Sequence, residues 1–326
     1  MRSAPGMGLR PGMSTIITAP MYHSAPNAQG LFAVALGIDL TIMTRFEAEQ
    51  FLAQVEQNRI THAQVVPTMF VRLLELPDEV RDRYDLSSLE GVVHAAAPCA
   101  PHIKKRMIEW FGPVILEYYG GTETGIVVAC DSEEWLAHEG TVGRPIEDAD
   151  IHIFDPLGGL LPGGEAGEIY VRPPGYSAGF TYLGQDDKRR EIERDGYISI
   201  GDVGHVDEDG FLFLSDRARD MVISGGVNIY PIEIEACLLE LAGVRDAAVF
   251  GIPDEAYGEA LAAHVDVDPS AGLTENAIRD HVRDRLAGYK VPRVVVFDDN
   301  LPREPSGKLF KRRIREQYWQ DAGRAI

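Results

Sequence analysis

The chain has 326 residues, of which 51 are acidic and 31 basic, giving a formal net charge of −20. This length predicts about two domains, and a composition that is 45% hydrophobic and 25% charged is that of an ordinary globular protein. The charge excludes a general nucleic-acid or anionic-membrane binder, because phosphates bind clustered Lys and Arg. The longest apolar run, residues 31–38, is too short to cross a bilayer and is interrupted by Gly37.

The three cysteines, Cys99, Cys130 and Cys237, are scattered without a Cys-x-x-Cys pair. This spacing excludes a disulfide framework or a cysteine-rich zinc site and favours buried thiols in a reducing compartment. The N-terminus carries Arg2 and Arg10, but Gly and Pro interrupt it where a signal peptide needs an apolar core. We therefore expect a cytoplasmic protein.

Apolar runs alternate with segments of helical spacing between residues 39 and 119. We expect strands at 39–43, 63–66, 91–97 and 114–119, and helices at 47–58, 68–76 and 103–111. Strands separated by helices form βαβ units, whose strands pair in parallel. Residues 1–145 are therefore predicted to form a partial, doubly wound α/β sheet.

The pattern changes after residue 145. Short alternating runs between 150 and 214 are separated by turn pairs such as Gly163-Gly164, which predicts a small antiparallel β subdomain over residues 146–218. Helices are expected at 231–241 and 274–286, followed by a strand at 294–297 and a basic C-terminal helix. Residues 219–326 are therefore expected to form a separate α+β domain.

Several short patterns are better explained by structure than by chemistry. Residues 175–179 match the G-x-S-x-G pattern of a hydrolase nucleophile, but two prolines precede them and no helical pattern follows. We expect a surface loop there, and a hydrolase based on Ser177 is the weakest alternative. Residues 207–210 resemble a calcium loop without its bidentate Glu and are expected to form a hairpin turn. His138 lacks the second histidine of a zinc-protease helix.

A glycine-rich segment with hydroxyl and carboxylate side chains follows the strand expected at 114–119. Gly120 and Gly121 allow a ligand to approach the backbone closely, and Tyr119 can stack on a planar ring. Thr122 offers a hydroxyl to a phosphate, and Glu123 is a hard carboxylate suited to Mg²⁺. Because ligands of open α/β sheets collect at the carboxyl ends of strands, this segment is a candidate nucleotide site. A tight turn is the alternative.

Two further groups of residues could hold parts of a nucleotide. Ala96, Ala97 and Pro98 end the preceding strand with no bulky side chain, which leaves a flat slot. Asp202, at the end of an apolar run, can accept both hydroxyls of a ribose, and Arg217 can donate to the same sugar or to phosphate. The alternatives are a turn cap for Asp202 and a solvated salt-bridge partner for Arg217.

The last part of the chain offers two more candidates. Gly225 and Gly226 end an apolar strand at a point where only bare backbone fits. Lys308 follows a Pro- and Gly-containing loop and is a movable point charge for an anionic transition state. The alternative for Lys308 is the start of an ordinary basic helix.

Taken in order, these segments resemble the motifs of the adenylate-forming superfamily, which includes acyl-CoA synthetases, aryl-CoA ligases, luciferases and peptide-synthetase adenylation domains. The motifs are Tyr-Gly-x-Thr-Glu, Gly-Asp, Asp-Arg-x-x-Asp and Pro-Arg-x-x-x-Gly-Lys, and the resemblance runs from Ala19 to the C-terminus. It implies the adenylate-forming fold with a mobile C-terminal domain. It also implies an ATP-dependent acyl-CoA ligase that activates a fatty or related aliphatic acid as acyl-adenylate and transfers it to coenzyme A, releasing AMP and pyrophosphate.

The resemblance implies a role for each matching residue, with Arg219 at a hinge position where Asp or Lys is usual. In chain order these roles are His23 at the mouth of the acyl pocket, Ala96, Ala97, Pro98 and Tyr119 around the adenine, Gly120 and Gly121 beside the nucleotide, Thr122 at the α-phosphate, Glu123 at Mg²⁺, Asp202 and Arg217 at the ribose, Gly225 and Gly226 along the pantetheine tunnel, and Lys308 bridging acyl and phosphate oxygens.

One family element has no counterpart in the sequence. Residues 1–18 do not contain the Ser/Thr/Gly-rich loop, ending in Pro-Lys-Gly, that grips the β- and γ-phosphates in the family. The alternative function is therefore a catalytically impaired fragment that binds nucleotide or acyl-adenylate. Apolar faces left uncovered by a missing N-terminal part would favour self-association or a homo-oligomer. A peptide-synthetase adenylation domain and a luciferase-like oxidation are further alternatives.

Overall fold

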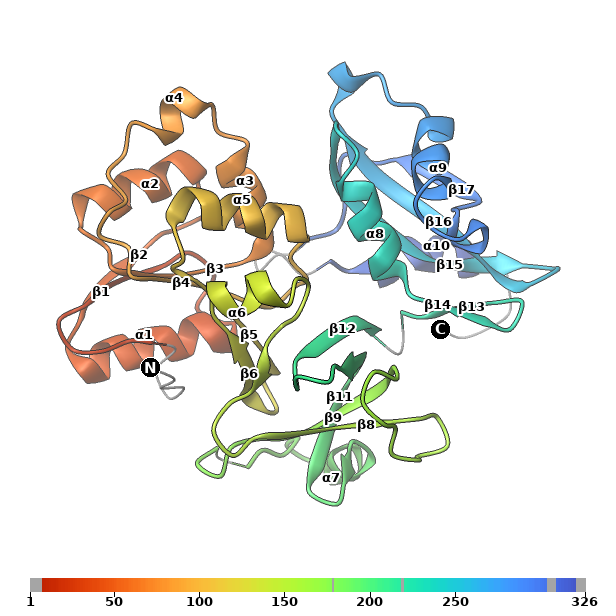
Figure 1. Ribbon diagram of the computed structural model, residues 1–326, viewed down its shortest axis with the longest axis horizontal. Helices are drawn as coiled ribbons and strands as arrows, with labels where there is room; N and C mark the ends of the chain where they lie inside the picture. Colours follow the sequence, from red (N-terminus) through yellow and green to blue (C-terminus); the bar gives the residue numbers. More distant parts are fainter. Residues whose placement is uncertain (1–7, 178, 218–219, 304–308, 321–326) are drawn as a thin grey trace. The chain divides into compact units, whose positions relative to one another are not determined.

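The computed structural model describes residues 8–177, 179–217, 220–303 and 309–320 (Figure 1). Within these residues the chain divides into two compact units. The first unit contains the chain up to Ile200 together with Gly204–Leu214. The second contains Gly201–Val203 and most of the chain from Ser215 onward. In the described residues the first unit holds a seven-stranded sheet and most of a second sheet, the second unit holds a third sheet, and each unit has its own hydrophobic core.

The first sheet has seven strands in the order β2-β1-β3-β4-β5-β6-β7. The first five pair in parallel, which confirms the predicted βαβ architecture, and the last two pair antiparallel. The strands are β1 (Ser14–Ile17), β2 (Asp39–Ile42), β3 (His62–Val65), β4 (Gly91–His94), β5 (Ile115–Gly121), β6 (Gly125–Cys130) and β7 (Arg144–Pro145). The chain passes from β1 to the edge strand β2 and then back beyond β1 to β3, so the strand order reverses beside β1. Ligand sites of open α/β sheets lie at the carboxyl ends of strands near such a reversal.

Helices cover both faces of this sheet (Figure 1). The helix α1 (Ser24–Leu36) lies on one face, whereas α2 (Ala48–Gln57), α3 (Pro67–Leu74), α4 (Asp78–Arg81) and α5 (Pro101–Phe111) lie on the other. In α2 the side chains of Phe51, Leu52 and Val55 are fully buried, as their helical spacing predicts. The short helix α6 (Ser132–Ala137) begins with a capping box between Asp131 and Glu134.

The second sheet is antiparallel, as expected for the region between residues 150 and 214. Its order is β10-β11-β9-β8, and β12 pairs with β11. The elements are β8 (Asp150–Phe154), β9 (Gly167–Arg172), α7 (Asp186–Glu191), β10 (Glu193–Arg194), β11 (Tyr197–Val206) and β12 (Leu212–Arg217). One hydrophobic cluster contains Tyr119 and Val128 of the first sheet with Ile169 and Leu212 of the second, so the two sheets share a core.

The second unit is built on a sheet of order β14-β13-β16-β15, with β17 paired to β16. Helices pack on both faces of this sheet, with α8 and α9 in one apolar cluster and α10 in another. The elements are β13 (Val222–Ser224), β14 (Val227–Ile229), α8 (Pro231–Leu239), β15 (Val244–Asp254), β16 (Gly258–Val267), η2 (Pro269–Ala271), α9 (Glu275–Arg283), η3 (Gly288–Lys290), β17 (Val294–Phe297) and α10 (Lys311–Trp319).

Three predicted strand ends differ from those observed. β4 ends at His94 instead of residue 97, because Ala96 has a φ of +75° and cannot continue an extended strand. β5 continues through Gly121 and turns directly into β6, so residues 122–124 form a hairpin tip. β11 continues past Asp202 to Val206, with Gly201 at a φ of +80° inside the strand, and the chain turns only at Asp207. Asp202 therefore lies inside a strand and not at its end.

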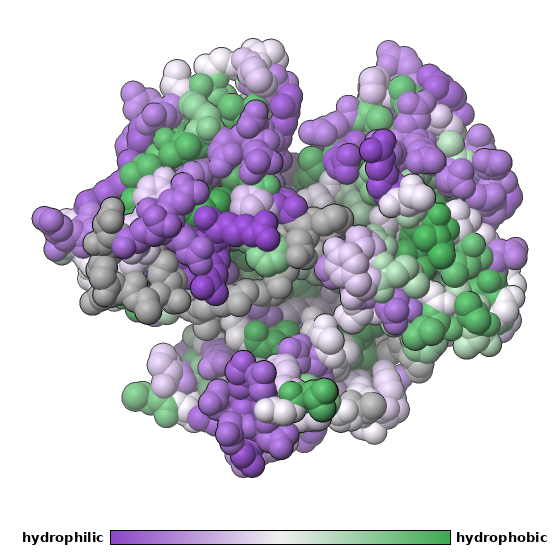
Figure 2. Space-filling model, turned by 180° about the vertical axis from the view of Figure 1, so that it is seen from behind, coloured by the Kyte–Doolittle hydropathy of each residue, from purple (hydrophilic) through white to green (hydrophobic). Residues whose placement is uncertain are grey.

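Two observations concern the surface. No helix in the described ranges is both long enough and apolar enough to cross a bilayer. Hydrophobic side chains gather into patches on the face seen in Figure 2, most clearly at its right-hand side. Gathered hydrophobic surface is characteristic of an interface, whereas single exposed hydrophobic residues are ordinary.

Candidate nucleotide and acyl site

The candidate nucleotide segment forms the tip of the β5–β6 hairpin. The hydroxyl of Thr124 closes this tip, because it accepts a hydrogen bond from the backbone N–H of Gly121 (2.9 Å) and donates one to the carbonyl of Gly125 (3.1 Å). A Cβ atom at Gly120 would lie only 1.9 Å from that same carbonyl oxygen. Gly120 is therefore required by the close approach of the two strands, in addition to leaving the backbone bare for a ligand.

The histidine segment meets this hairpin tip. His23 is the N-cap of α1, which starts shortly after β1, and Ser24 is the first helical residue. The hydroxyl oxygens of Ser24 and Thr122 are 3.2 Å apart, although the two residues are 98 positions apart in the sequence. Tyr22 is 72% exposed and its ring centroid lies 4.4 Å from that of His23. The reversal of strand order thus brings the expected acyl and phosphate residues together at one edge of the sheet.

The carboxylate of Glu123 is held by a residue that the sequence analysis did not identify. The phenolic hydroxyl of Tyr182 donates a hydrogen bond to Glu123 Oε1 over 3.0 Å. Desolvation and this hydrogen bond raise the pKa of Tyr182. Carboxylate and hydroxyl oxygens suit Mg²⁺, which proteins usually bind through one or two carboxylates together with substrate phosphates. The oxygen donors of Glu123 and Thr122 therefore fit that ion chemically.

The slot expected at residues 96–98 is a bend after β4. Ala96 is exposed and in the left-handed region, which residues other than glycine rarely occupy. Strain of this kind tends to be kept where a ligand site needs it. The parallel pairing of β4 with β5 ends at His94 and Glu117, so residues 96–98 follow the carboxyl end of β4 while β5 continues through Tyr119. Ala97 is half-buried, Pro98 is exposed and Tyr119 is 7% exposed, and the place of these residues around an adenine stays a prediction.

A buried charged cluster lies on β4, β5 and α5 close to these strand ends. Lys104 Nζ is 2.5 Å from Glu117 Oε2, and His94 Nε2 is 3.5 Å from the same oxygen. Burial, together with the charge of Lys104, lowers the pKa of His94 well below its usual value, so the imidazole is neutral. Burial raises the pKa of Glu117, and the charge of Lys104 opposes that rise. The one sequence signal for this cluster is a lysine on the helical face of Met107 and Ile108.

Asp202 and Arg217 lie in the second sheet. Asp202 follows Ile200 on β11, and Ile200 Cδ1 would be 3.2 Å from a Cβ atom at Gly121. Arg217 is the last residue of β12. Asp202 belongs to the second compact unit, whereas the β5–β6 hairpin belongs to the first. The ribose role of Asp202 and Arg217 therefore stays a prediction.

Gly225 and Gly226 form the tip of the β13–β14 hairpin. Their φ angles are +57° and +81°, and a two-residue hairpin turn with positive φ at both positions strongly favours glycine. The backbone N–H of Gly225 donates a hydrogen bond to the carbonyl of Tyr257 (2.9 Å). The glycine pair is thus required by the turn, and its place along a pantetheine tunnel stays a prediction.

The catalytic candidate Lys308 and the hinge candidate Arg219 lie outside the described residues. The residues that flank the Lys308 segment are well anchored. Arg303 forms a bidentate ion pair with Asp246, and its backbone bridges to Leu309. Burial alone would lower the pKa of Arg303, but the hydrogen bonds and charge of Asp246 raise it. The guanidinium is therefore a permanently charged anchor next to the segment that carries Lys308.

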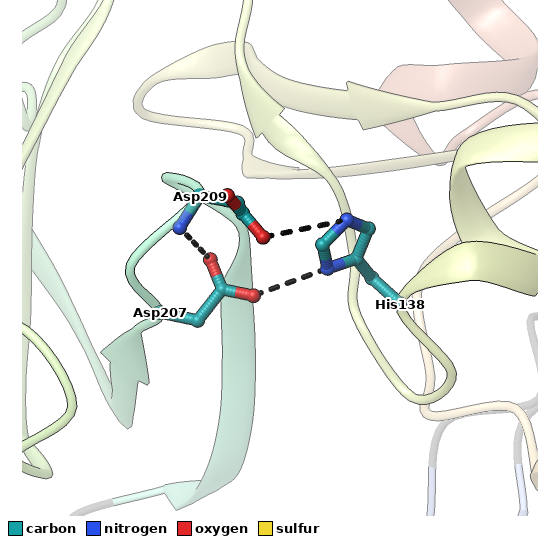
Figure 3. Close-up of side chains that lie close together, drawn as sticks. All are labelled: His138, Asp207 and Asp209. Carbon is teal, nitrogen blue, oxygen red and sulfur yellow. Dashed lines mark hydrogen bonds and ion pairs between the residues drawn. The ribbon is translucent and has the colours of Figure 1, made fainter.

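His138, Asp207 and Asp209 lie close together and are the types of residue that bind metals (Figure 3). His138 Nδ1 is 3.2 Å from Asp207 Oδ2, whereas Nε2 is 4.0 Å from Asp209 Oδ2. Because the two ring nitrogens face different carboxylates, the imidazole does not direct one nitrogen at a point shared by both. Asp207 Oδ1 accepts the backbone N–H groups of Asp209 (3.0 Å) and Phe211 (2.8 Å). The arrangement is the expected hairpin turn, with His138 hydrogen-bonded to Asp207.

The G-x-S-x-G segment does not form a nucleophile elbow. The backbone N–H of Ser177 donates a hydrogen bond to the carbonyl of Pro174 (2.8 Å), which is a turn. Residue 178 is outside the described part of the chain, and the next helix, α7, begins only at Asp186. A nucleophilic serine needs a strand leading directly into it and a helix leading directly out. The loop interpretation therefore fits the structure.

Two family matches account for most of the chain. Residues 2–181 match the AMP-binding enzyme family, and residues 233–308 match the AMP-binding enzyme C-terminal domain. The first match contains the His23 segment, the bend at residues 96–98 and the β5–β6 hairpin. The second contains most of α8, all of β15 and β16, and the Lys308 segment.

The chain is also similar to individual proteins. It is 36% identical to a 3-[(3aS,4S,7aS)-7a-methyl-1,5-dioxo-octahydro-1H-inden-4-yl]propanoyl:CoA ligase of Rhodococcus jostii (strain RHA1), over 93% of this chain and 57% of the relative. It is 34% identical to a medium/long-chain-fatty-acid–CoA ligase of Mycobacterium tuberculosis, over 90% of this chain and 52% of the relative. It thus spans about half the length of these relatives.

A solved structure shows the same fold. The amide bond synthetase McbA from Marinactinospora thermotolerans superimposes with a TM-score of 0.87 at 33% identity, over 97% of this chain and 64% of that one. The match to the first family covers more than half of the residues, and its C-terminal companion follows in the expected order. The chain therefore belongs to the AMP-binding enzyme family.

Proposed function

We propose that the chain carries the nucleotide and acyl site of an ATP-dependent acyl-CoA ligase. In this reaction a carboxylate oxygen attacks the α-phosphorus of ATP, which releases pyrophosphate and forms an acyl-adenylate. The thiol of coenzyme A then attacks the acyl carbon, and AMP leaves. The observation that supports this proposal best is the 3.2 Å approach of Ser24 to Thr122, which joins the expected acyl and phosphate segments. The two relatives described above are named CoA ligases, and we take a fatty or related aliphatic acid as the proposed substrate.

The roles proposed for the first unit follow from the side chains at the sheet edge. Tyr119 and the small residues at 96–98 border the adenine, and Thr122 donates a hydrogen bond to the α-phosphate. Glu123 holds Mg²⁺, and the hydrogen bond from Tyr182 fixes the orientation of that carboxylate. When bound, Mg²⁺ supplies positive charge that offsets the charge of the phosphates. His23 lies at the entrance of the acyl pocket.

The roles proposed for the remaining candidates belong to two steps. Asp202 and Arg217 hold the ribose in both steps. Lys308 stabilises the negative charge that develops on phosphorus during adenylation. A rotation of residues 219–326 about Arg219 then replaces Lys308 with the Gly225-Gly226 hairpin, which lines the path of the pantetheine arm.

A second candidate function has its own supporting observation. The chain spans about half the length of its relatives and has no Pro-Lys-Gly phosphate loop in residues 1–18. Under this second candidate the chain binds AMP or an acyl-adenylate without turning over ATP.

Pyrophosphate release by the 326-residue chain tests these candidates. The assay contains ATP, Mg²⁺ and a panel of fatty, alicyclic and aromatic acids. We expect release that depends on the acid and falls on the order of 10²-fold in Lys308→Ala, because one charge-stabilising group is lost. Lys188→Ala, on the exposed surface of α7, is the matched control and should keep the original rate.

A second assay separates the half-reactions. Lys308→Ala should still form thioester from a supplied acyl-adenylate and coenzyme A at a rate close to that of the original chain. Equal loss of both steps would contradict the role proposed for Lys308. A folded chain that binds AMP but releases no pyrophosphate would favour the second candidate function.

A further inference from the structure

A surface pocket lies among α3, α4 and α5, three of the helices that cover the face of the first sheet opposite α1 (Figure 1). Its volume is about 390 Å³, which is at the small end of the range of small-molecule sites. All of its lining residues belong to the first unit, and none of them is a candidate for binding the nucleotide, the acid or coenzyme A. The pocket therefore has no part in the proposed function.

The pocket is also distant from the candidate nucleotide site along α5. This helix begins at Pro101, shortly after the bend at residues 96–98, whereas its pocket residues Arg106, Glu109 and Trp110 lie in its second half. From Pro101 to Trp110 an α-helix rises by roughly 14 Å, at 1.5 Å per residue. A ligand in the pocket and a nucleotide beside residues 96–98 would therefore occupy opposite ends of α5.

One part of the pocket lining has no unpaired charge. Leu74 is 7% exposed and belongs to the core cluster of the first unit, and Trp110 packs against that cluster. The guanidinium of Arg81 lies over the Trp110 ring, with its Cζ 5.3 Å from the ring centroid, and it forms an ion pair with Asp78. The charges of Arg81 and Asp78 thus offset each other, and Leu74 and Trp110 offer apolar surface to a ligand.

The other lining residues carry charges that are not paired. They are Asp82, Arg106 and Glu109, and all three are exposed. Within the described ranges none of their side chains forms a hydrogen bond or an ion pair with the protein. Arg106 and Glu109 are three positions apart in α5, but a basic residue on the N-terminal side of an acidic one is the less favourable order on a helix. One positive and two negative groups are therefore available to a ligand.

We propose that this pocket binds a small diamino carboxylic acid, an amino acid with two ammonium groups, one carboxylate and an aliphatic stem. Such a ligand carries the complement of the three unpaired charges. Arg106 donates hydrogen bonds to its carboxylate, and Glu109, which is about 5–6 Å away along the same helix side, accepts from the neighbouring α-ammonium. Asp82, at the end of α4, accepts from the second ammonium, and the stem packs on Leu74 and Trp110.

Isothermal titration of the 326-residue chain with L-lysine tests the proposal. We expect saturable binding with a dissociation constant below about 1 mM. Norleucine lacks the second ammonium, cadaverine lacks the carboxylate and Nα-acetyl-lysine lacks the free α-ammonium, so each should bind about fivefold or more weakly. Absence of saturable L-lysine binding up to about 10 mM would overturn the proposal, and so would equal affinity for norleucine or cadaverine. Equal affinity for Nα-acetyl-lysine would also overturn it and assign the pocket to a C-terminal lysine of a polypeptide.

Charge-removing substitutions locate the ligand. Arg106→Gln and Glu109→Gln should each weaken L-lysine binding about fivefold or more, because each removes one charge-assisted contact. Their far-ultraviolet circular dichroism should be unchanged, since neither side chain is paired in the free chain. Glu255→Gln, at an exposed position of the second unit, is the matched control and should keep the original affinity. Original affinity in both pocket variants would contradict the proposal.

Trp110 provides a spectroscopic readout of the same pocket. Of the three tryptophans, Trp135 is 1% exposed and Trp319 is 9% exposed, whereas Trp110 is only half-buried. L-lysine should shift the tryptophan emission of the original chain, and the shift should disappear in Trp110→Phe, which keeps an aromatic ring in the lining. A shift of the original size in Trp110→Phe would assign the ligand to another part of the chain and overturn the proposal.

Discussion

Two of the smallest residues of the candidate site determine the path of its backbone. Gly120 lets β5 approach β6, and Ala96 turns the chain away after β4 with a φ of +75°. Neither residue offers a functional group. Both nevertheless shape the backbone against which a nucleotide would lie, because side-chain bulk at these positions would fill the space between the strand ends.

Replacement of Gly120 by alanine should disrupt the β5–β6 hairpin. The added Cβ would lie 1.9 Å from the Gly125 carbonyl oxygen, and a backbone atom cannot move aside as the end of a side chain can. We expect the free energy of unfolding to fall by about 1–3 kcal/mol or more and AMP binding to weaken. Urea denaturation and isothermal titration with AMP would measure both effects.

Gly288→Ala is the matched control for this substitution. No atom lies within 4 Å of the Cβ that it would introduce, and Gly288 does not have a positive φ. Its unfolding midpoint should match that of the original chain. A Gly120→Ala variant with the stability and AMP affinity of this control would contradict the steric argument.

Among the candidate site residues, sequence reasoning named those whose chemistry is visible in a short motif. Tyr119, Thr122 and Glu123 lie at the strand end where the βαβ pattern predicts a ligand site. Tyr182 was not identified, because a single tyrosine in an irregular loop carries no local signal, and only the folded chain brings it 3.0 Å from Glu123. The contact between Ser24 and Thr122 was not predicted either. It depends on the order of the strands in the sheet, which the hydrophobic pattern of a short segment does not determine.

At the level of elements, the buried ion pair between Lys104 of α5 and Glu117 of β5 should stabilise the fold only while both charges are present. Lys104→Met leaves Glu117 buried without its counter-charge, and Glu117→Gln does the same to Lys104. Each single substitution should lower the free energy of unfolding by about 3–5 kcal/mol. The double variant should lose clearly less than the sum of the two, because it buries no unpaired charge.

A double-mutant cycle in urea measures this coupling. The exposed pair of Arg83 and Glu49, whose side chains are 59% and 49% exposed, is the matched comparison, and Arg83→Met should cost less than about 1 kcal/mol. Additive losses at Lys104 and Glu117 would show that the two charges do not depend on each other.

The elements that sequence predicted well are those with one buried face. The helix α2 alternates buried Phe51, Leu52 and Val55 with polar residues, so its period is visible in the sequence. The helix α1 was not identified, because it lacks charge on every side and reads as a plain apolar run. The strands β15 and β16 were missed for a related reason. Helices cover both faces of their sheet, so residues 247–252 are all buried and no alternation remains.

At the level of the whole molecule, the proposed roles assign adenine, α-phosphate and acyl group to residues of this chain. Residues 1–18 do not contain the Pro-Lys-Gly sequence to which the resemblance assigns the β- and γ-phosphates. The 326-residue chain should therefore bind a non-hydrolysable acyl-adenylate analogue at least tenfold more tightly than ATP, a difference of roughly 1.4 kcal/mol or more. Isothermal titration with the two ligands under the same Mg²⁺ concentration would measure this difference. Comparable affinities would count against it.

The β15–β16 hairpin has a consequence for the order in which the chain folds. Its two long strands pair along their whole length, from Val244 with Val267 to Asp254 with Gly258, across a tight turn. The parallel strands of the first sheet instead pair across long connections, as between β1 and β3, where Thr15 lies opposite His62. Closing a long connection loses chain entropy before any strand pairing forms. A hairpin with a tight turn loses much less.

We therefore expect the second unit to form its backbone hydrogen bonds before the first. Pulse-labelled hydrogen exchange during refolding should protect amides of β15 and β16 earlier than those of β1 and β3. Simultaneous protection of the two sheets would mean that the units fold cooperatively. In the expected order, the second unit is ordered first, and the sheet edge that carries the candidate nucleotide site is completed last.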